Sequence, residues 1–205
     1  MGENNKGNLH YLPPGFRFYP TDEELVVHFL HRKASLLPCH PDVIPDLDLL
    51  TFDPWDLNGK ALGEGNQWYF FSRKTPERLT PNGCWKAVGI EEPVVSSASN
   101  KRVGMKKYFV FHLVGEAAAA DVQTNWVMHE YRLSDAAAAS TSRSSKRRPH
   151  PDYSKWVLCR VYEHNSDNDD DGGNELSCLD EIFLSLDDLD EISFPEPHAL
   201  KKSYI

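Results

Sequence analysis

The chain has 205 residues, of which 40% are hydrophobic and 26% are charged, so it is long enough for one domain of ordinary size and a tail. Its net charge of −9, taken alone, argues against a nucleic-acid ligand. The charge is unevenly spread, however: residues 1–163 hold 20 Lys and Arg against 19 Asp and Glu, whereas residues 164–205 hold 2 against 12. The first part is therefore nearly neutral, and the acidity belongs to the C-terminal part.

The four cysteines are widely spaced, and no pair of cysteine or histidine residues has the spacing of zinc ligands. No apolar run resembles a signal peptide or a membrane span. We therefore expect a reduced intracellular protein with no metal, no cofactor and no membrane segment. No local motif supports cysteine–histidine catalysis, and the sequence offers no assembled nucleophile, base and oxyanion donor, so we do not expect an enzyme.

The first predicted element is a helix from Thr21 to about Ser35. Prolines and a glycine at residues 13–15 break regular structure before it, and Thr21 followed three residues later by Glu24 has the pattern of a capping box. Apolar residues recur at steps of four inside the segment, as expected for one buried helix face. Prolines at positions 38, 41 and 45 are expected to end the helix.

After Gln67 the pattern changes to aromatic and β-branched runs of strand length, separated by connections rich in Gly, Ser or Ala. The runs lie at residues 68–71, 108–114, 125–132 and 155–162. They favour a twisted antiparallel β-sheet packed between a few helices, which is an α+β fold. We place this domain at residues 9–163.

Two stretches of the domain are strongly basic. Residues 72–107 hold 8 Lys and Arg against 3 acids, and residues 143–160 hold 6 against one. Clustered positive charge on an otherwise neutral fold suits phosphate, and the alternative is ordinary solvated surface charge. In the second stretch, a short run is either a nuclear import signal or a further phosphate contact. It consists of Lys146, Arg147 and Arg148.

From His164 the chain is rich in Asp and Asn, which makes a solvated linker with little apolar surface to bury. Beyond it, apolar residues recur at steps of three and four among carboxylates from Leu176 to Leu189. This acidic amphipathic segment either becomes helical against a partner or folds back onto the domain. We expect residues 164–205 to be a regulatory tail that is largely disordered in isolation.

Five blocks of the sequence resemble, in order, those of NAC domains, a family of plant transcription factors. The first block reads Leu-Pro-Pro-Gly-Phe-Arg-Phe-Tyr-Pro-Thr-Asp-Glu-Glu-Leu at residues 12–25. The others lie at residues 52–57, 68–71 with 83–89, 124–133 and 156–162, so that the resemblance spans about three quarters of the chain. It implies a nuclear transcription regulator that binds double-stranded DNA. It also implies a homodimer, or a heterodimer with other NAC proteins.

The resemblance further implies that one strand enters the major groove of DNA. This strand corresponds to Trp85, Lys86, Ala87, Val88 and Gly89. Lys86 is at the family's basic position, and Trp85 is expected to be a packing anchor. We expect the basic residues around this strand to contact phosphate, which positions a protein without specifying sequence. These residues are Arg73, Lys74, Arg78, Lys101, Arg102, Lys106 and Lys107.

The chain departs from the family pattern near this strand. Val88 stands where Thr is usual, and Glu91 and Glu92 stand where the family has an acid followed by lysine. Residues 115–121 also replace a segment that is commonly basic. An acid beside the duplex opposes binding, and each lost phosphate contact lowers the salt-dependent affinity. We therefore expect weaker DNA binding than in typical members.

The resemblance also assigns a dimer interface. Arg17 and Glu24 are expected to form a reciprocal ion pair across a two-fold axis, with the segment that begins at Leu12 alongside. From the residues alone, Glu24 would be a helix cap and Arg17 a solvated charge.

The tail contains a stretch that resembles the Leu-x-Cys-x-Glu ligand of retinoblastoma-type pocket proteins. It consists of Leu176, Cys178, Asp180 and Glu181, with the first acid an Asp and the Glu one place late. So short a match also arises by chance.

The short tail and the altered strand most resemble the xylem branch of the family. This similarity implies a role in xylem or vascular differentiation, as a negative regulator that sequesters stronger partners in dimers. The alternative is an activator whose acidic amphipathic tail recruits the transcription machinery.

Overall fold

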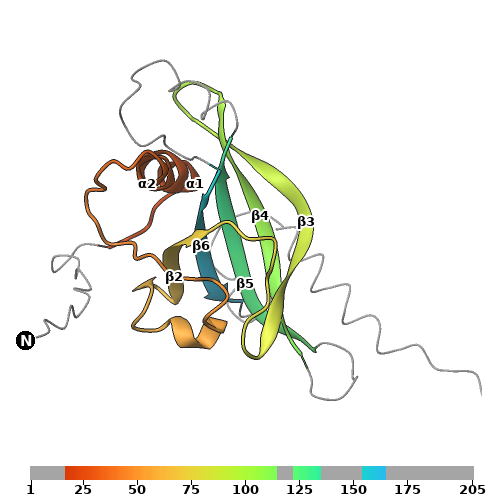
Figure 1. The fold of residues 1–205 in the computed structure, drawn as a ribbon. Helices are drawn as coiled ribbons and strands as arrows, with labels where there is room; N and C mark the ends of the chain where they lie inside the picture. Colours follow the sequence, from red (N-terminus) through yellow and green to blue (C-terminus); the bar gives the residue numbers. More distant parts are fainter. Residues whose placement is uncertain (1–16, 115–121, 135–153, 165–205) are drawn as a thin grey trace, which may run out of the picture. The chain divides into compact units, whose positions relative to one another are not determined.

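The structure is a computed structural model that describes residues 17–114, 122–134 and 154–164. All of them belong to one unit of the chain, Met1–Asp169. Figure 1 follows these elements from the N-terminal helix, in red, to the last strand, in blue. Of the predicted tail, only His164 is among the described residues.

The N-terminal helix begins where the sequence predicts it. The hydroxyl of Thr21 accepts a hydrogen bond from the backbone N–H of Glu24 (3.2 Å). In return, Oε2 of Glu24 accepts one from the backbone N–H of Thr21 (2.8 Å). The capping box is therefore confirmed, and it satisfies N–H groups that have no partner inside the helix.

The helix runs without a break through three stretches. They are α1 (Asp22–Glu24), the wider π-helical turns of η1 (Leu25–Leu30) and α2 (His31–Ala34). It ends before the prolines, where Leu36 adopts a left-handed conformation (φ 55°). The N–H of Leu37 then returns to the carbonyl of Arg32 at 2.9 Å, which satisfies one of the last carbonyls.

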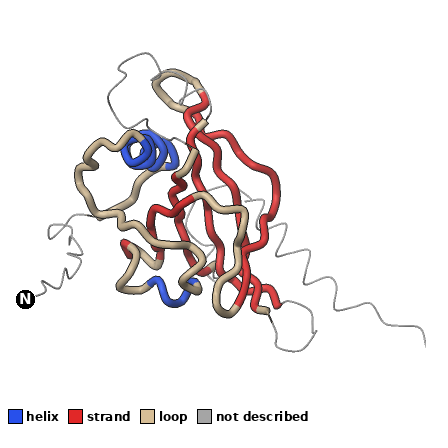
Figure 2. Tube along the Cα trace, in the orientation of Figure 1, coloured by secondary structure: helices blue, strands red, loops and turns tan. Residues whose placement is uncertain are grey.

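The sheet has six strands, all paired antiparallel, in the order β1-β2-β6-β5-β4-β3. Their bounds are β1 (Leu62–Glu64), β2 (Gln67–Arg73), β3 (Gly83–Val95), β4 (Arg102–Leu113), β5 (Val122–Leu133) and β6 (Trp156–Glu163). The last strand is inserted between β2 and β5, and β3 lies at the outer edge. Figure 2 shows the strands in red with the helix against one side.

Side chains alternate across the strands, so the sheet has two faces with separate cores. The face that packs against the helix is called the helix face below. Its core joins Leu25, Val26 and Leu30 of the helix to residues of the sheet. The sheet residues are Leu62, Tyr69, Phe71, Val94, Tyr131, Leu133 and Leu158.

One glycine sets how closely the helix approaches the sheet. A Cβ on Gly104 would lie 2.7 Å from the carbonyl oxygen of Arg132 and 2.8 Å from Cγ1 of Val26. Such distances are well below van der Waals contact, so only glycine fits here without a shift of the helix or of β5. The close contact brings the first turn of the helix over β4 and β5.

The other face is covered in part by residues 47–61, including the 3-10 turn η2 (Pro54–Leu57). The buried carboxylate of Asp53 accepts hydrogen bonds from the hydroxyl of Thr80 (2.5 Å) and the side-chain amide of Asn82 (2.6 Å). Asp53 therefore joins the connection between β2 and β3 to the segment that contains η2.

The predicted antiparallel sheet is confirmed, and the described residues show fewer separate helices beside it than the words "a few helices" imply. These residues contain one continuous helical segment and the single turn η2. The prolines at 38, 41 and 45 lead into an extended segment, which pairs with β2 only through the isolated bridge between Asp46 and Phe71.

Candidate nucleic-acid interface

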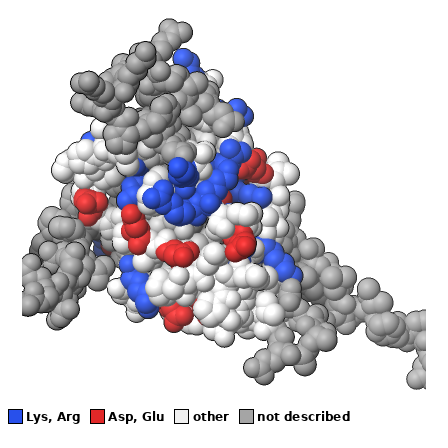
Figure 3. All heavy atoms as spheres, in the orientation of Figure 1, with Lys and Arg blue, Asp and Glu red and all other residues white. Residues whose placement is uncertain are grey.

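Positively charged side chains gather on the face of the sheet opposite the helix. Figure 3 shows Lys and Arg as a band on this side, with separate carboxylates below it. The band overlies a hollow of about 770 Å³ between the β2–β3 connection and strands β3, β4 and β5. The surface formed by the hollow's four basic residues is called the basic face; they are Lys74, Arg78, Lys107 and Arg132.

Arg78 forms the floor of the hollow. Its Nη2 lies 2.7 Å from Oε2 of Glu130, and both side chains are nearly buried, with exposed fractions of 16% and 6%. Its guanidinium lies over the ring of Phe109 at 5.1 Å and donates to the carbonyls of Thr75 and Glu77. A phosphate bound by Arg78 would therefore compete with Glu130.

Burial raises the pKa of Glu130 above its usual value, although Arg78 and Lys107 act in the opposite direction. The pair therefore works mainly as a structural tie between the β2–β3 connection and β5. Removing one partner alone would leave a buried charge without its counter-ion.

Arg132 forms the second ion pair on the basic face. Its Nε and Nη2 lie 2.6 and 2.7 Å from the two carboxylate oxygens of Glu91, a bidentate arrangement. The hydrogen bond to Arg132 lowers the pKa of Glu91. The negative charge of Glu91, beside the predicted DNA-contact strand, is therefore matched locally by Arg132.

Lys74 and Lys107 have the freest positions on this face. Lys74 is exposed, and Lys107 is half-buried with its ammonium 5.5 Å from the centre of the Phe109 ring. These two side chains can reach an anion above the hollow without breaking an ion pair seen in the structure. They are thus the best placed of the predicted phosphate contacts on the basic face.

The predicted DNA-contact strand is the first half of β3. Trp85 is 4% exposed and packs edge-on against Phe111 at 5.0 Å between ring centres, whereas Lys86 and Ala87 are exposed. At its start the outer edge of β3 is covered, because the N–H of Trp85 donates to the carbonyl of Arg78 (2.9 Å). From Lys86 onward, no strand among the described residues lies beside that edge.

A wide bulge interrupts β3 at the end of the motif. Val88 pairs with Tyr108 and the next paired residue is Glu92, opposite Lys106, so three residues of β3 face Lys107 alone. Gly89 takes a left-handed conformation there (φ 63°), which glycine adopts without strain. Ile90, at the centre of the bulge, is 79% exposed. The bulge therefore projects beyond the edge of the sheet.

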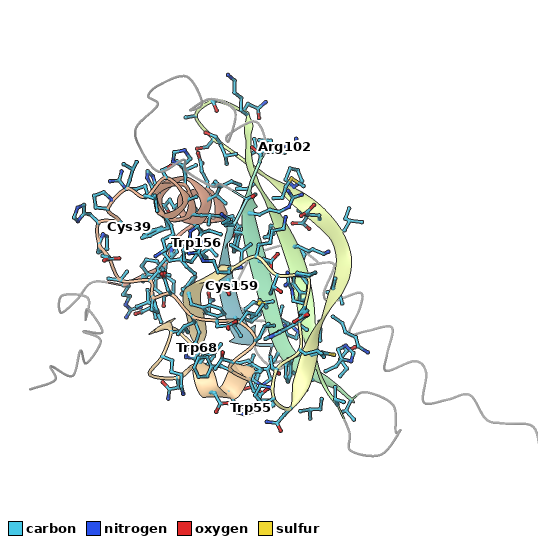
Figure 4. All side chains as sticks on the ribbon, in the orientation of Figure 1. Cys39, Trp55, Trp68, Arg102, Trp156 and Cys159 are labelled. Carbon is cyan, nitrogen blue, oxygen red and sulfur yellow. The ribbon has the colours of Figure 1, made fainter. Side chains whose placement is uncertain are left out.

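The remaining predicted contacts lie elsewhere. Arg73 is on the helix face with its guanidinium 3.8 Å from the centre of the Trp156 ring. Lys101 and Arg102 are exposed at the turn between β3 and β4, and Figure 4 shows Arg102 at the end of the sheet opposite Trp55. Lys106 points to the helix face, where it meets Asp22 and Glu92. The phosphate contacts assigned to these residues stay predictions.

Both described residues of the predicted dimer interface, Arg17 and Glu24, are exposed, and Glu24 also serves the helix cap. Leu12 lies outside the described residues, as do the predicted import and partner motifs. Those motifs are Lys146, Arg147 and Arg148, and Leu176, Cys178, Asp180 and Glu181.

Sequence reasoning missed Glu130 and Arg132 as parts of the basic face. They are two residues apart in a strand, so alternation places both on one face. No local pattern indicates their partners, because Arg78 and Glu91 come from segments that are distant in the sequence.

No helix in the described part of the chain is long and apolar enough to cross a membrane. Among the same residues no three His, Cys, Asp or Glu side chains are grouped as metal ligands, and Cys39, Cys84 and Cys159 are free thiols. Figure 4 shows Cys39 and Cys159 well apart.

Comparison with known sequences matches residues 13–133 to the family described as No apical meristem (NAM) protein. NAC domain-containing protein 104 of Arabidopsis thaliana is 66% identical over 194 residues, which are 90% of this chain and 99% of that protein. NAC transcription factor 25 of the same plant is 44% identical over 81% of this chain and 54% of its own length. NAC domain-containing protein 58 of Oryza sativa subsp. japonica is 47% identical over 78% of this chain and 44% of its own length. The chain thus spans nearly all of the first relative and about half of the other two.

Proposed function

The chain belongs to the NAC family, since the No apical meristem match covers more than half of its length, and from this premise we propose that it is a sequence-specific DNA-binding regulator of transcription. Relatives in this family carry names such as NAC transcription factor 25, which describe regulators and not enzymes. In this proposal the protein acts in the nucleus, either as a homodimer or as a heterodimer with other NAC proteins.

The observation that carries the proposal is the bulged outer strand β3 beside the basic face. An exposed strand segment can enter the major groove of B-DNA, which admits a β-ribbon. Lys86, Ala87 and Val88 precede the bulge, and Lys74 and Lys107 flank it with positive charge. In this arrangement β3 reads bases while the lysines hold phosphate.

Binding to duplex DNA tests the proposal directly. The full chain is incubated with a random duplex library, the enriched sequence is synthesised, and its affinity is compared with that of a scrambled duplex over a range of salt concentrations. We expect preference for the enriched duplex and a logarithmic affinity that falls linearly with the logarithm of salt. A chain that enriches no sequence would refute the proposal.

Matched variants separate the two kinds of contact. Val88→Ala should reduce the preference for the enriched duplex, because it alters the strand that reads bases. Lys60→Ala serves as the charge control, since Lys60 is exposed near η2 and contacts the carbonyl of Asp56 and the Phe52 ring. Its affinity and salt dependence should equal those of the wild type.

For the dimer, we propose that Arg17 and Glu24 pair reciprocally across a two-fold axis, with the segment at Leu12 alongside. The exposed positions of Arg17 and Glu24 and the family resemblance support this. Arg17→Glu should shift the sedimenting mass to that of a monomer, and adding Glu24→Arg should partly restore the dimer. A dimer that neither single reversal changes would remove both residues from the interface.

We propose that the domain occupies residues 9–163 and the acidic tail residues 164–205. The charge difference between these parts supports the boundary. Limited proteolysis should cut first within residues 167–173, and early cuts within β5 or β6 would contradict it.

We propose further that Lys146, Arg147 and Arg148 direct nuclear import. The charge of this run supports the assignment. A fluorescent fusion of the full chain should lose its nuclear concentration when all three are changed to alanine, and should keep it when Lys201 and Lys202 are changed instead.

The finer biological proposal is negative regulation in xylem or vascular differentiation, with a retinoblastoma-type pocket protein as a partner of the tail. The altered residues of the predicted DNA-contact strand and the acidic residues after position 163 support this proposal. The second candidate is an activator, which the acidic amphipathic pattern from Leu176 to Leu189 favours. A tail fused to a neutral DNA-binding domain should lower reporter expression in the first case and raise it in the second.

The xylem proposal and the pocket-protein proposal have separate tests. Loss of the gene in its own plant should alter the number of differentiated xylem vessels. Changing Leu176 and Cys178 to alanine should abolish capture by a purified pocket protein, and an unchanged capture would exclude the motif.

A further inference from the structure

The bulge in β3 is closed on the helix face by the side chain of one tyrosine. Tyr108 pairs with Val88 at the start of the bulge, and its hydroxyl donates to Oε2 of Glu92 at 2.7 Å. Glu92 is the first paired residue after the bulge. Tyr108 therefore ties together the two ends of the projecting segment.

Lys106 continues this connection into the helix. Its ammonium lies 3.2 Å from Oε2 of Glu92 and 2.9 Å from Oδ2 of Asp22, the first residue of α1. The Lys106 side chain is only 16% exposed. Burial alone would lower its pKa, but hydrogen bonds to Tyr108 and Asp22 outweigh burial and raise the pKa above the usual value. Lys106 thus stays charged and is held between two carboxylates.

Asp22, which is partly buried, is itself attached to the core of the helix face. Its Oδ1 accepts a hydrogen bond from the hydroxyl of Tyr131 (2.6 Å) and lies 3.9 Å from Nη1 of Arg160. Tyr131 is fully buried. The carboxylate is therefore a rigid point to which Lys106 and Glu92 are attached.

We propose that Asp22, acting through Lys106 and Glu92, holds the β3 bulge in the position from which it contacts DNA. Lys106 is then a positioning residue and not a phosphate contact. This inference rests on the proposed function. It assigns to the helix a part in DNA binding, although none of its residues lies on the basic face.

The physical reason is pre-organisation. Fixing the backbone of a residue costs conformational entropy, so a bulge that is already ordered binds more tightly than one that becomes ordered on the DNA. Gly89 gives the segment conformational freedom at one end. The ion pairs that connect Glu92 through Lys106 to Asp22 restrict the segment at its other end.

Removing a carboxylate gives opposite results under the two roles of Lys106. If Lys106 contacts phosphate, Asp22→Asn releases it from a competing acid and leaves DNA binding as tight or tighter. If Lys106 positions the bulge, Asp22→Asn weakens binding to the enriched duplex by about tenfold, the effect of freeing about one backbone residue. The salt dependence should stay that of the wild type.

Glu92→Gln provides a second variant that does not disturb the core. Its carboxylate belongs to a side chain that is 39% exposed, and glutamine can still accept from Tyr108. We expect binding to weaken by about threefold, which is the direction opposite to that of removing a repelling acid. This variant decides the question if Asp22→Asn does not fold.

Lys106→Met completes the series. A lost phosphate contact lowers the salt slope by about 0.9, whereas a lost positioning contact weakens binding with the slope unchanged. Adding Asp22→Asn to Lys106→Met should weaken binding no further, since both act through one connection. Asp46→Asn is the control, because Asp46 pairs with Lys33 near β2 and not with β3; its binding should equal that of the wild type.

All affinities are measured well below the melting temperature of each variant, so that a change in stability alone does not alter them. Wild-type protein that prefers no duplex would refute the proposed function. Wild-type protein that binds its duplex while Asp22→Asn and Glu92→Gln bind equally or more tightly would overturn only the positioning role.

Discussion

Lys106 and Lys107 are neighbours in the sequence but lie on opposite faces of the sheet. Lys106 enters a network of carboxylates and tyrosines under the helix, whereas Lys107 borders the hollow of the basic face with an aromatic ring beside it. The same residue type on the same strand thus has two different surroundings. Positive charges on a strand must be counted by face before they are assigned to a ligand.

The two faces also differ in how their charges are matched. On the helix face, Lys106 and Arg160 converge on Asp22. On the basic face, Glu91 and Glu130 are matched by Arg132 and Arg78, while Lys74 and Lys107 extend beyond these pairs. We therefore expect truncations in the apolar core of the helix face to act mainly on stability. Changes in the connection from Asp22 through Lys106 to Glu92 should act on the affinity for DNA, and changes of the two lysines on its salt dependence.

The largest effect is expected for Leu25→Ala in the core of the helix face. Leu25 is fully buried, and truncation of a buried leucine typically lowers the free energy of unfolding by about 2–5 kcal/mol. Urea denaturation measures the loss. The folded fraction should keep the wild-type salt dependence of DNA binding. A changed slope of affinity against salt would show that the core of the helix face also affects the phosphate contacts.

The next effect is expected for Lys74→Ala combined with Lys107→Ala. Binding should weaken for the enriched and the scrambled duplex alike, and the salt slope should fall by about two, since each phosphate contact contributes about 0.9. The free energy of unfolding should change by less than about 0.5 kcal/mol. A loss confined to the enriched duplex would show that these lysines read bases instead.

A smaller effect concerns pH and returns to the helix face. Burial, with Arg160 and Lys106 nearby, lowers the pKa of His129 well below its ordinary value of 6.5. Below about pH 6.5 the unfolded chain therefore binds a proton that the folded chain does not, and the free energy of unfolding falls as pH falls. The decline should reach about 1 kcal/mol between pH 7.5 and 5.5.

His129→Asn should remove most of this decline, because asparagine does not titrate. Its side-chain oxygen can still accept a hydrogen bond from Nη2 of Arg160, which lies 2.7 Å from Nδ1 of the histidine. Chemical denaturation at both pH values gives the comparison. His31 also has a lowered pKa, but it contributes equally to both proteins. An identical decline in the variant would assign the pH dependence to other groups.

The smallest effect is expected at the start of the helix. Thr21→Ala removes the side-chain half of the capping box and should lower the free energy of unfolding by about 1 kcal/mol, whereas Thr21→Ser should leave it nearly unchanged. Thermal denaturation of both variants tests this. Equal melting temperatures for the two would mean that the cap contributes nothing.

The helix and four of the strands could be predicted because their signals are local. The capping box at Thr21 and the aromatic runs of β2, β4, β5 and β6 lie within single segments. The second half of β3 has no such signal, since Glu91, Glu92 and Pro93 interrupt any alternation. Its strand structure comes from pairing with β4, a contact that only the folded chain provides.

The basic face could be predicted in part. Charge counting found Lys74 and Lys107, and it also found Lys106, which the fold turns the other way. Alternation predicts that adjacent lysines separate, but it does not say which of the two meets the helix. That outcome depends on Asp22, which is distant in sequence and is brought close by the packing of Val26 on Gly104.

The open edge of β3 has a consequence for how the protein behaves in concentrated solution. An outer strand with unpaired N–H and C=O groups can pair with the same strand of another molecule, which leads to aggregation. In β3 the pairing surface is short, because residues near Arg78 cover its start and the bulge at Gly89 bends it soon afterwards. The bulge thus also protects against sheet-to-sheet association, and a variant that straightened it would be expected to precipitate.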